Sequence, residues 1–288
     1  MKKLRNIAII AHVDHGKTTL VDHMLRQTGV FRSNEAVQDC VMDSNDLERE
    51  RGITILAKNT SVTYKDTKIN IIDTPGHHDF GGEVERVLAM ADGALVLVDG
   101  ADGPMPQTRY VLEKALSSGL ELILVINKLD RPEARPAEVL DELQYLLLEL
   151  EADDRQLHAP VIYAIGRTGK AKSNLDGEWE DLTSLFDTIL EHIPAPKVDP
   201  EGSFCMGVSS LDYNDYVGRM AIGRVSAGVA ETEKDVFLLK RDGKKIRGKI
   251  VKVETFDKLG RQTVPMAEAG DICCIAGLPD CDLGDTIA

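Results

Sequence analysis

Cysteine motifs and long apolar runs are missing from this chain of 288 residues. The five cysteines, at positions 40, 205, 273, 274 and 281, form no Cys-x-x-Cys pair and no Cys/His cluster with zinc-ligand spacing. We therefore expect free thiols, as in cytoplasmic proteins. No apolar run approaches the ~20 residues that span a bilayer. The short apolar run after the basic segment 1–5 predicts a strand at a sheet edge and no signal peptide.

Acidic residues outnumber basic ones. The formal net charge is −14, and residues 1–202 hold 22 Lys and Arg against 35 Asp and Glu, whereas residues 203–288 are nearly balanced. An acidic surface does not attract nucleic acid over its whole area. We expect no DNA partner, no membrane partner, and contact with RNA only through local patches or through segments outside this sequence.

Short apolar runs alternate with stretches of helical length in the first two thirds of the chain. The runs cover residues 7–10, 69–72, 94–98, 122–126 and 161–164. The candidate helices cover residues 17–27, 79–90, 107–118, 137–150 and 181–192. A stripe of leucines on the fourth helix is expected to be core. This alternation predicts an α/β fold with a doubly wound, mostly parallel sheet.

A different pattern follows a stretch that is rich in proline. Pro194, Pro196, Pro200 and Gly202 cannot sustain a helix or an interior strand, so we expect a linker over 194–203. The first domain then covers 1–196 and the second 203–288. Alternating runs at 204–209, 217–225, 236–240, 249–255 and 271–276 predict that the second domain is a small antiparallel β-barrel.

A candidate phosphate-binding loop, Ala-His-Val-Asp-His-Gly-Lys-Thr, occupies residues 11–18 between the first apolar run and the first candidate helix. In such loops backbone N–H groups face phosphate oxygens, the lysine reaches the β- and γ-phosphates, and a Ser or Thr hydroxyl binds Mg²⁺. Lys17 and Thr18 fit these last two roles. Ala11 replaces the first glycine of the usual pattern. The expected nucleotide contacts of this loop also include His15, Gly16 and Thr19.

Two further motifs follow predicted strand ends, where open α/β sheets bind ligands. Asp73-Thr74-Pro75-Gly76 could be an ordinary turn, but an aspartate there can hold Mg²⁺, and Gly76 lets a backbone N–H approach the γ-phosphate. Asn127-Lys128-Leu129-Asp130 could be a solvated loop. The Asp130 carboxylate can instead accept two hydrogen bonds from guanine N1 and N2, a donor pair that adenine lacks. Together the motifs predict a guanine nucleotide site.

Residues 30–57 are long for a connection without structure, and such loops tend to be functional. They contain Arg-Gly-Ile-Thr-Ile, where Thr54 is a candidate second hydroxyl on Mg²⁺. We expect a switch loop that the γ-phosphate orders. His77 directly follows Gly76 and is the candidate catalytic residue that positions the attacking water, whereas His78 is the weaker alternative.

These segments resemble the translational GTPases of the elongation-factor class, and among them most closely the BipA/TypA family. Residues 39–48, 95–107, 211–218 and 222–225 also resemble that family. The resemblance implies a GTPase of the ribosome that acts in translation or large-subunit assembly under stress. It implies that Asp14, Lys17, Thr18 and Thr54 bind phosphate and Mg²⁺, and that Asp14 helps to hold a monovalent cation. Asn127, Lys128 and Asp130 would recognise guanine, and His77 would align water.

Two departures from the family limit this resemblance. The last guanine-contacting segment, Ser-Ala-Leu/Lys in the family, is Ile165-Gly166-Arg167 here, so the serine that braces the loop is absent and nucleotide binding is expected to be looser. The Gly166 N–H is still expected to meet guanine O6. Family members also carry further C-terminal domains that contact the ribosome. Without them we expect a monomer that binds GTP but hydrolyses it slowly.

Two alternatives remain open. A nucleotide-sensing module could use GTP or a guanosine stress nucleotide to toggle the switch loop, with incidental hydrolysis. Another elongation-like GTPase, or the GTPase subunit of sulfate activation, would share the two-domain layout.

Overall fold

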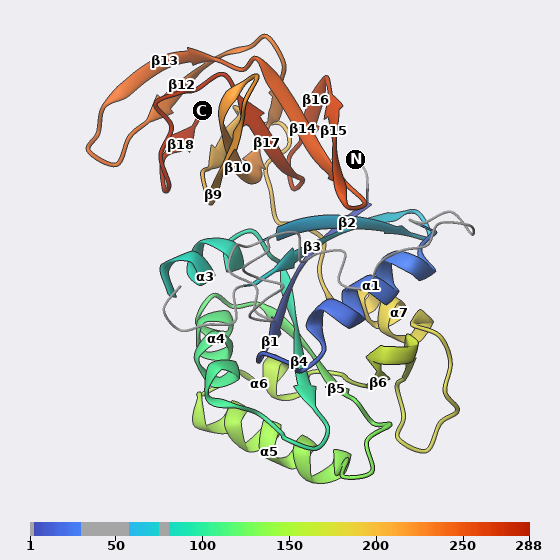
Figure 1. Cartoon of the computed structure of the whole chain (residues 1–288). Helices are drawn as coiled ribbons and strands as arrows, with labels where there is room; N and C mark the ends of the chain where they lie inside the picture. Colours follow the sequence, from blue (N-terminus) through green and yellow to red (C-terminus); the bar gives the residue numbers. More distant parts are fainter. Residues whose placement is uncertain (1–2, 30–57, 75–80) are drawn as a thin grey trace.

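The computed structural model describes residues 3–29, 58–74 and 81–288, which form an α/β domain followed by an antiparallel β domain (Figure 1). The first domain has a seven-stranded sheet in the order β2-β3-β1-β4-β5-β6-β7. Its parallel strands are β1 (Lys3–Ala11), β3 (Thr67–Asp73), β4 (Gly93–Asp99), β5 (Glu121–Asn127) and β6 (Val161–Ile165). The predicted parallel sheet is confirmed. The expectation of an edge strand after the basic segment 1–5 is wrong, because β1 lies between β3 and β4 in the interior of the sheet.

Antiparallel strands close both edges of this sheet: β2 (Lys58–Tyr64) pairs with β3, and β7 (Lys170–Lys172) pairs with β6. Sequence patterns missed both strands. Their sequences, KNTSVTY and KAK, contain few apolar residues, because an edge strand has less sheet around it to bury its side chains.

Helices cover both faces of the sheet (Figure 1). Alternate side chains of β1 explain this, because Ile7 and Ile9 enter one core and Ala8 and Ile10 enter the other. The first core packs against α1 (Lys17–Gln27) and α7 (Thr183–His192). The second packs against α3 (Gly81–Leu88), α4 (Pro106–Ser117) and α5 (Pro136–Glu149). The predicted helices agree with these bounds to within two residues wherever the structure describes them.

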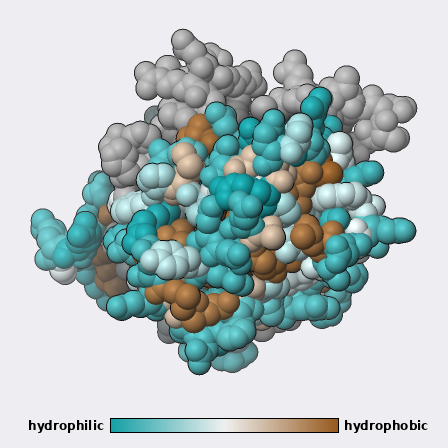
Figure 2. All heavy atoms as spheres, turned by 90° about the horizontal axis from the view of Figure 1, so that it is seen from below, coloured by the Kyte–Doolittle hydropathy of each residue, from teal (hydrophilic) through white to brown (hydrophobic). Residues whose placement is uncertain are grey.

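The apolar stripe on α5 is core as expected, since Val139, Leu143, Leu146 and Leu147 are buried. Two short elements were not predicted. One is α6 (Asp154–Leu157), which starts with a capping box, and the other is the 3-10 helix η2 (Gly166–Thr168). Seen from below, the first domain has a largely hydrophilic surface with separate apolar areas (Figure 2). In the described ranges, no helix has the length and apolar character that crossing a bilayer requires.

The second domain consists of antiparallel strands, as predicted. A nine-stranded sheet runs β13-β12-β18-β8-β10-β17-β14-β15, with β9 paired to β10, and a separate pair joins β11 to β16. The strands are β8 (Cys205–Gly207), β9 (Ser210–Asn214), β10 (Gly218–Ala227), β11 (Val229–Glu231), β12 (Asp235–Leu239), β13 (Lys245–Lys249), β14 (Lys252–Asp257), β15 (Gly260–Val264), β16 (Met266–Glu268), β17 (Ile272–Ala276) and β18 (Thr286–Ile287). Each of the five predicted runs overlaps one of them.

Buried polar contacts join the two domains at the middle of β1 and β3. Lys68 lies 2.9 Å from the Asp271 carboxylate, and Asn70 donates to the same carboxylate at 3.1 Å. Asn6 donates to the Gly270 carbonyl oxygen at 2.9 Å. These contacts hold the second domain away from the carboxyl ends of the parallel strands, which remain available for a site.

A second set of contacts surrounds this centre. Arg224 of β10 forms a 2.9 Å ion pair with Asp92, and the Ser61 hydroxyl donates to the Phe256 carbonyl oxygen at 2.8 Å. An apolar core of the first domain continues into Ile222 and other buried residues of the second. The junction therefore combines apolar packing with hydrogen bonds and ion pairs between buried polar groups.

Candidate functional site

The predicted motifs meet at the carboxyl ends of the parallel strands. The phosphate loop follows β1, Asp73 ends β3 and Asn127 ends β5. Because these strands are parallel neighbours in one sheet, their ends lie along the same edge (Figure 1). This edge is where open α/β folds bind ligands.

The phosphate loop has the backbone conformation that a tight anion-binding turn requires. Asp14 and Gly16 both have positive φ, 63° and 94°, and the His15 N–H donates to the His12 carbonyl oxygen at 3.2 Å. Helix α1 then starts at Lys17 with no side chain capping its N-terminus. The backbone N–H groups in the first turn of a helix, here beginning at Lys17, favour an anion.

Gly16 is required by its surroundings as well as by its backbone angle. A Cβ atom on Gly16 would lie 2.5 Å from Asn127 Nδ2. The loop therefore passes so close to the end of β5 that only glycine fits there.

Lys17 reaches the end of β3. Its ammonium lies 2.6 Å from the Asp73 carboxylate and donates to the Thr74 carbonyl oxygen at 2.7 Å. Both side chains are largely buried, with 11% and 4% of their surface exposed. The sequence predicts that Lys17 binds phosphate and that Asp73 binds Mg²⁺, and the structure places these two side chains in contact.

Asn127 links three loops. Its side-chain Nδ2 donates to the His15 carbonyl oxygen at 2.9 Å, and its Oδ1 accepts from the Gly166 N–H at 2.8 Å. The Asn127 side chain was not predicted as the acceptor of the Gly166 N–H, and the expected contact of this N–H with guanine O6 stays a prediction.

The loop at Ile165, Gly166 and Arg167 is braced without the serine that it lacks. His23 of α1 contacts the Arg167 carbonyl oxygen at 3.1 Å, and Gln27 donates to the Gly169 carbonyl oxygen at 2.7 Å. Helix α1, which carries the phosphate loop at its start, thus supports this loop as well.

Lys128 and Asp130 complete the predicted base-recognition loop. Lys128 has a φ of 60° and forms a 3.0 Å ion pair with the buried Asp99. Positive φ is uncommon outside glycine and tends to occur at functional sites. Asp130 is exposed, and within the described part of the chain its side chain forms no hydrogen bond or ion pair. Its carboxylate is therefore able to accept hydrogen bonds from a ligand.

His15 faces inward between these loops. Only 2% of its surface is exposed, and its Nδ1 accepts from the Asp99 N–H at 3.3 Å. Burial, followed by the nearby His12, lowers its pKa to about 4, against the opposing effect of Asp99. The ring is therefore neutral at pH 7 and serves as a hydrogen-bond acceptor.

Sequence reasoning missed Asp99 and Arg131. Asp99 is fully buried at the end of β4, and Arg131 lies 2.8 Å from its carboxylate. The available signal was an aspartate directly after the apolar run 94–98, in the same position relative to its strand as Asp73.

Three predicted site residues, Thr54, Gly76 and His77, lie outside the described residues, as does His78. In the described ranges no three His, Cys, Asp or Glu side chains gather in a metal cluster. This arrangement still fits Mg²⁺, which commonly takes one or two protein oxygens together with substrate phosphates and water. Thr18 and Asp73 provide a hydroxyl and a carboxylate on adjacent elements.

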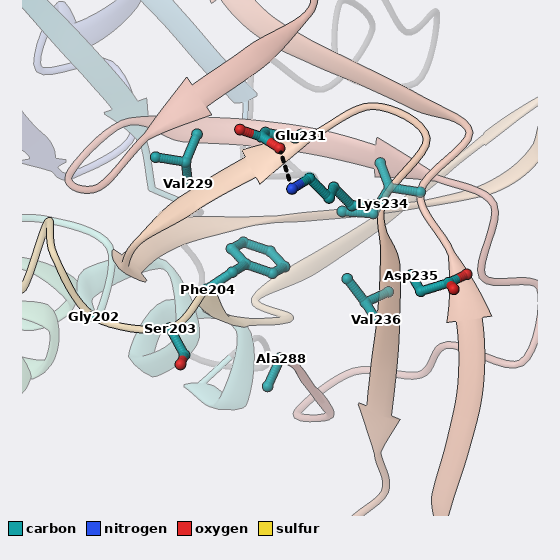
Figure 3. Close-up of a pocket in the computed structure, with 10 residues that line it drawn as sticks. Gly202, Ser203, Phe204, Val229, Glu231, Lys234, Asp235, Val236 and Ala288 are labelled. Atoms are coloured by element: carbon teal, nitrogen blue, oxygen red, sulfur yellow. Dashed lines mark ion pairs between the residues drawn. The ribbon is translucent and has the colours of Figure 1, made fainter.

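A separate hollow of about 370 Å³ lies in the second domain (Figure 3). Phe204, Val229 and Val236 form apolar walls, and Lys234 pairs with Glu231 at 2.9 Å on its rim. Its lining includes none of the predicted nucleotide-binding residues.

Comparison with known proteins gives consistent matches over both domains. The elongation factor Tu GTP binding domain matches residues 2–195, and elongation factor Tu domain 2 matches residues 218–288. The chain is 54% identical to the large ribosomal subunit assembly factor BipA of Synechocystis sp. and 52% identical to that of Bacillus subtilis. Both alignments cover 99% of this chain but only 48% and 46% of the relatives. The chain thus spans about half their length.

The crystal structure of the bacterial selenocysteine-specific elongation factor EF-Sec has the same fold. The match has a TM-score of 0.74 at 23% sequence identity, and it covers 99% of this chain and 44% of that chain.

Proposed function

Since the chain belongs to the family of the elongation factor Tu GTP binding domain, we propose that it binds GTP and GDP and hydrolyses GTP to GDP and phosphate. One observation carries the proposal: motifs far apart in the sequence are joined at one sheet edge. Lys17 contacts Asp73, and Asn127 links the phosphate loop to the loop after β6. The site would thus engage phosphate, metal and base at once.

The phosphates bind the first turn of α1 and its preceding loop. Asp14, His15 and Gly16 shape this loop, and the Lys17 ammonium leaves Asp73 to meet the β- and γ-phosphates. Thr18 and Asp73, together with Thr54, hold Mg²⁺, which neutralises charge on the transferred phosphoryl group. A monovalent cation binds beside Asp14 as a further part of this proposal.

Guanine binds beside β5. Asp130 accepts from guanine N1 and N2, while Asn127 and Lys128 hold the base-recognition loop against the phosphate loop. Ile165, Gly166 and Arg167 flank the base, with Asn127 as the hydrogen-bond partner of Gly166. This arrangement favours GTP over ATP.

His77 aligns the attacking water. The water oxygen forms a bond to the γ-phosphorus, the bond from this phosphorus to the bridging oxygen breaks, and GDP leaves while the protons of the water stay on the phosphate product or pass to solvent. Positioning of water is the remaining requirement of such an in-line displacement, and a neutral imidazole can meet it by accepting a hydrogen bond from the water.

The proposed partner is the ribosome, since the chain shares 52–54% identity with proteins named as large ribosomal subunit assembly factors. We propose a cytoplasmic monomer that acts in translation or in assembly of the large subunit. Because the relatives are about twice as long, we propose that full ribosome affinity depends on domains that correspond to the rest of their chains, while this chain retains weaker binding.

Single-turnover GTP hydrolysis with and without ribosomes tests this function. Ribosomes are expected to stimulate turnover by the wild type, and His77→Ala should abolish the stimulation while leaving the Kd for GTP within about twofold, since water positioning contributes little to ground-state binding. The exposed His192→Ala serves as a control. Equal Kd values for GTP and ATP would contradict the proposed base recognition.

The same experiment separates the alternative function. A nucleotide-sensing module would bind GTP selectively and dock on its partner, yet ribosomes would leave the hydrolysis rate of the wild type and of His77→Ala unchanged.

A further inference from the structure

Asp99 is a buried carboxylate that belongs to none of the predicted nucleotide motifs. It ends β4, the strand between β1 and β5, and its surface is fully buried. One of its oxygens, Oδ1, accepts from the Ala101 N–H at 2.8 Å. Burying a carboxylate is costly unless it is paired, so the partners of its other oxygen determine what it does.

Two cations of the base-recognition loop share that other oxygen. Lys128 Nζ lies 3.0 Å and Arg131 Nη1 lies 2.8 Å from Asp99 Oδ2. Arg131 has a second, exposed partner in Asp102, at 3.3 Å, whereas Asp99 is the ion-pair partner found for Lys128 in the described part of the chain. The position of the Lys128 ammonium therefore depends on Asp99.

The backbone of Asp99 is tied to the phosphate loop as well. Its N–H donates to His15 Nδ1 at 3.3 Å, and the following Gly100 N–H donates to the Asn127 carbonyl oxygen at 2.7 Å. The Lys128 stem also runs beside the phosphate loop, because a Cβ atom on Gly16 would lie 3.8 Å from Lys128 Cε. One residue thus contacts both halves of the proposed nucleotide site.

The charge state of Asp99 suits this role. Burial alone would raise its pKa, but the Ala101 N–H, Lys128 and Arg131 outweigh burial and hold the pKa below the usual range of an aspartate. The carboxylate is therefore charged throughout the neutral range and keeps attracting both cations.

We propose that Asp99 is a positioning residue for guanine recognition, which fixes the Lys128 side chain between the base-recognition loop and the phosphate loop. This inference rests on the proposed guanine nucleotide site. Asp99 does not touch the nucleotide; it acts through Lys128. Since its link to His15 uses the backbone N–H, replacing the side chain changes the base half of the site and leaves the phosphate half in place.

Calorimetric titration of the full chain with Mg²⁺-GDP and Mg²⁺-ADP tests this inference. In Asp99→Asn the Kd for GDP should rise about tenfold, the loss expected for one hydrogen bond to a charged group, while the Kd for ADP stays nearly constant. The preference for GDP over ADP falls by the same factor. Asp102→Asn is the matched control, because it removes a carboxylate of the same cluster that pairs with Arg131 and not with Lys128.

Lys128→Met and the double variant Asp99→Asn/Lys128→Met complete the design. If Asp99 acts through Lys128, the double variant binds GDP no more weakly than Lys128→Met alone. If Asp99 has a structural role unrelated to the base, Asp99→Asn should weaken the binding of GDP and ADP equally. Alternatively, the losses of GDP affinity in Asp99→Asn and Lys128→Met should multiply in the double variant. Either result overturns the inference.

Two further outcomes, a folding failure of Asp99→Asn and a wild type without nucleotide preference, can be told apart from the results above. If Asp99→Asn does not fold, Lys128→Met alone tests the inference. An unchanged preference of Lys128→Met for GDP over ADP would contradict a role of Asp99 through Lys128. If the wild type itself binds GDP and ADP equally, the proposed function fails before the role of Asp99 is in question.

Discussion

The Lys17 ammonium and the Asp73 carboxylate form a 2.6 Å ion pair at the junction of α1 and β3. Both groups are expected to serve a bound nucleotide, one through phosphate and the other through Mg²⁺. Their direct pairing means that a nucleotide must replace this contact when it binds.

This competition predicts that Asp73→Asn increases nucleotide affinity only when Mg²⁺ is absent. With Mg²⁺ chelated, the variant should bind GDP about three- to tenfold more tightly than the wild type, since Lys17 no longer pairs with a carboxylate and no carboxylate repels the phosphates. With Mg²⁺ present the advantage should disappear. Titration with a fluorescent GDP analogue measures both. Asp66→Asn, at an exposed pair with Lys3, is the control and should change neither value. Equal affinities without Mg²⁺ would refute the competition.

Gly16→Ala should eliminate tight nucleotide binding. The new Cβ would lie 2.5 Å from Asn127 Nδ2, at a φ of 94° that disfavours side chains. Gly119→Ala is the control. Gly119 also has a positive φ, 69°, so the backbone strain is similar, but no atom lies within 4 Å of the new Cβ. It should cost about 1–2 kcal/mol of stability and leave nucleotide affinity unchanged. Thermal unfolding and GDP titration of both variants check this, and GDP binding by Gly16→Ala at wild-type affinity would contradict the close approach.

Stability should depend on pH through His15. Its pKa is about 4 in the folded protein, below the ordinary histidine value of 6.5, so the unfolded state binds more protons between these values. Stability from this group is thus complete above pH 6.5 and is lost as pH falls towards 4. Its neighbours are His12, Asp99 and Lys128. His15→Asn should reduce the loss between pH 7 and pH 4 by about 2–3 kcal/mol, measured by urea unfolding. The exposed His192→Asn should retain the wild-type dependence.

Arg224→Met should weaken the domain junction. Burial raises the pKa of Asp92, and the nearby Arg224 opposes this increase. In the variant the Asp92 side chain, which is 9% exposed, would lose this cation. We expect a loss of about 2–3 kcal/mol in the free energy of unfolding. The loss should shrink as pH falls, because protonation relieves an unpaired buried carboxylate. Arg247→Met removes an exposed ion pair with Asp235 and should change stability by less than about 1 kcal/mol. Calorimetry at pH 8 and pH 5 tests both, and equal effects of the two variants would contradict a structural role for the junction pair.

Most of the fold was predictable because its signals are local. The apolar runs that became β1, β3, β4, β5 and β6 are buried on both faces of the sheet, so they stand out against the polar segments between them. The polar edge strands β2 and β7 have no such contrast. Their strand structure depends on pairing with β3 and β6, which is not visible in their own residues.

The site was predictable to a similar extent. Lys17, Asp73 and Asn127 lie together as their motifs indicated, whereas the hydrogen bond from the Gly166 N–H to the Asn127 side chain was not predicted. That hydrogen bond depends on where Asn127 lies, 39 residues earlier in the chain. The roles of Thr54 and His77 stay predictions.

The sequence by itself determined the alternation of strands and helices, the glycine at the turn of the phosphate loop and the guanine-specific residue types, because each depends on neighbours within a few positions. Only the tertiary structure decided how Asp99 holds Lys128 and how Asp271 meets Lys68 and Asn70. The members of these contacts are 29 to 203 residues apart in the chain, and an isolated aspartate acquires a role only when folding buries it beside a cation.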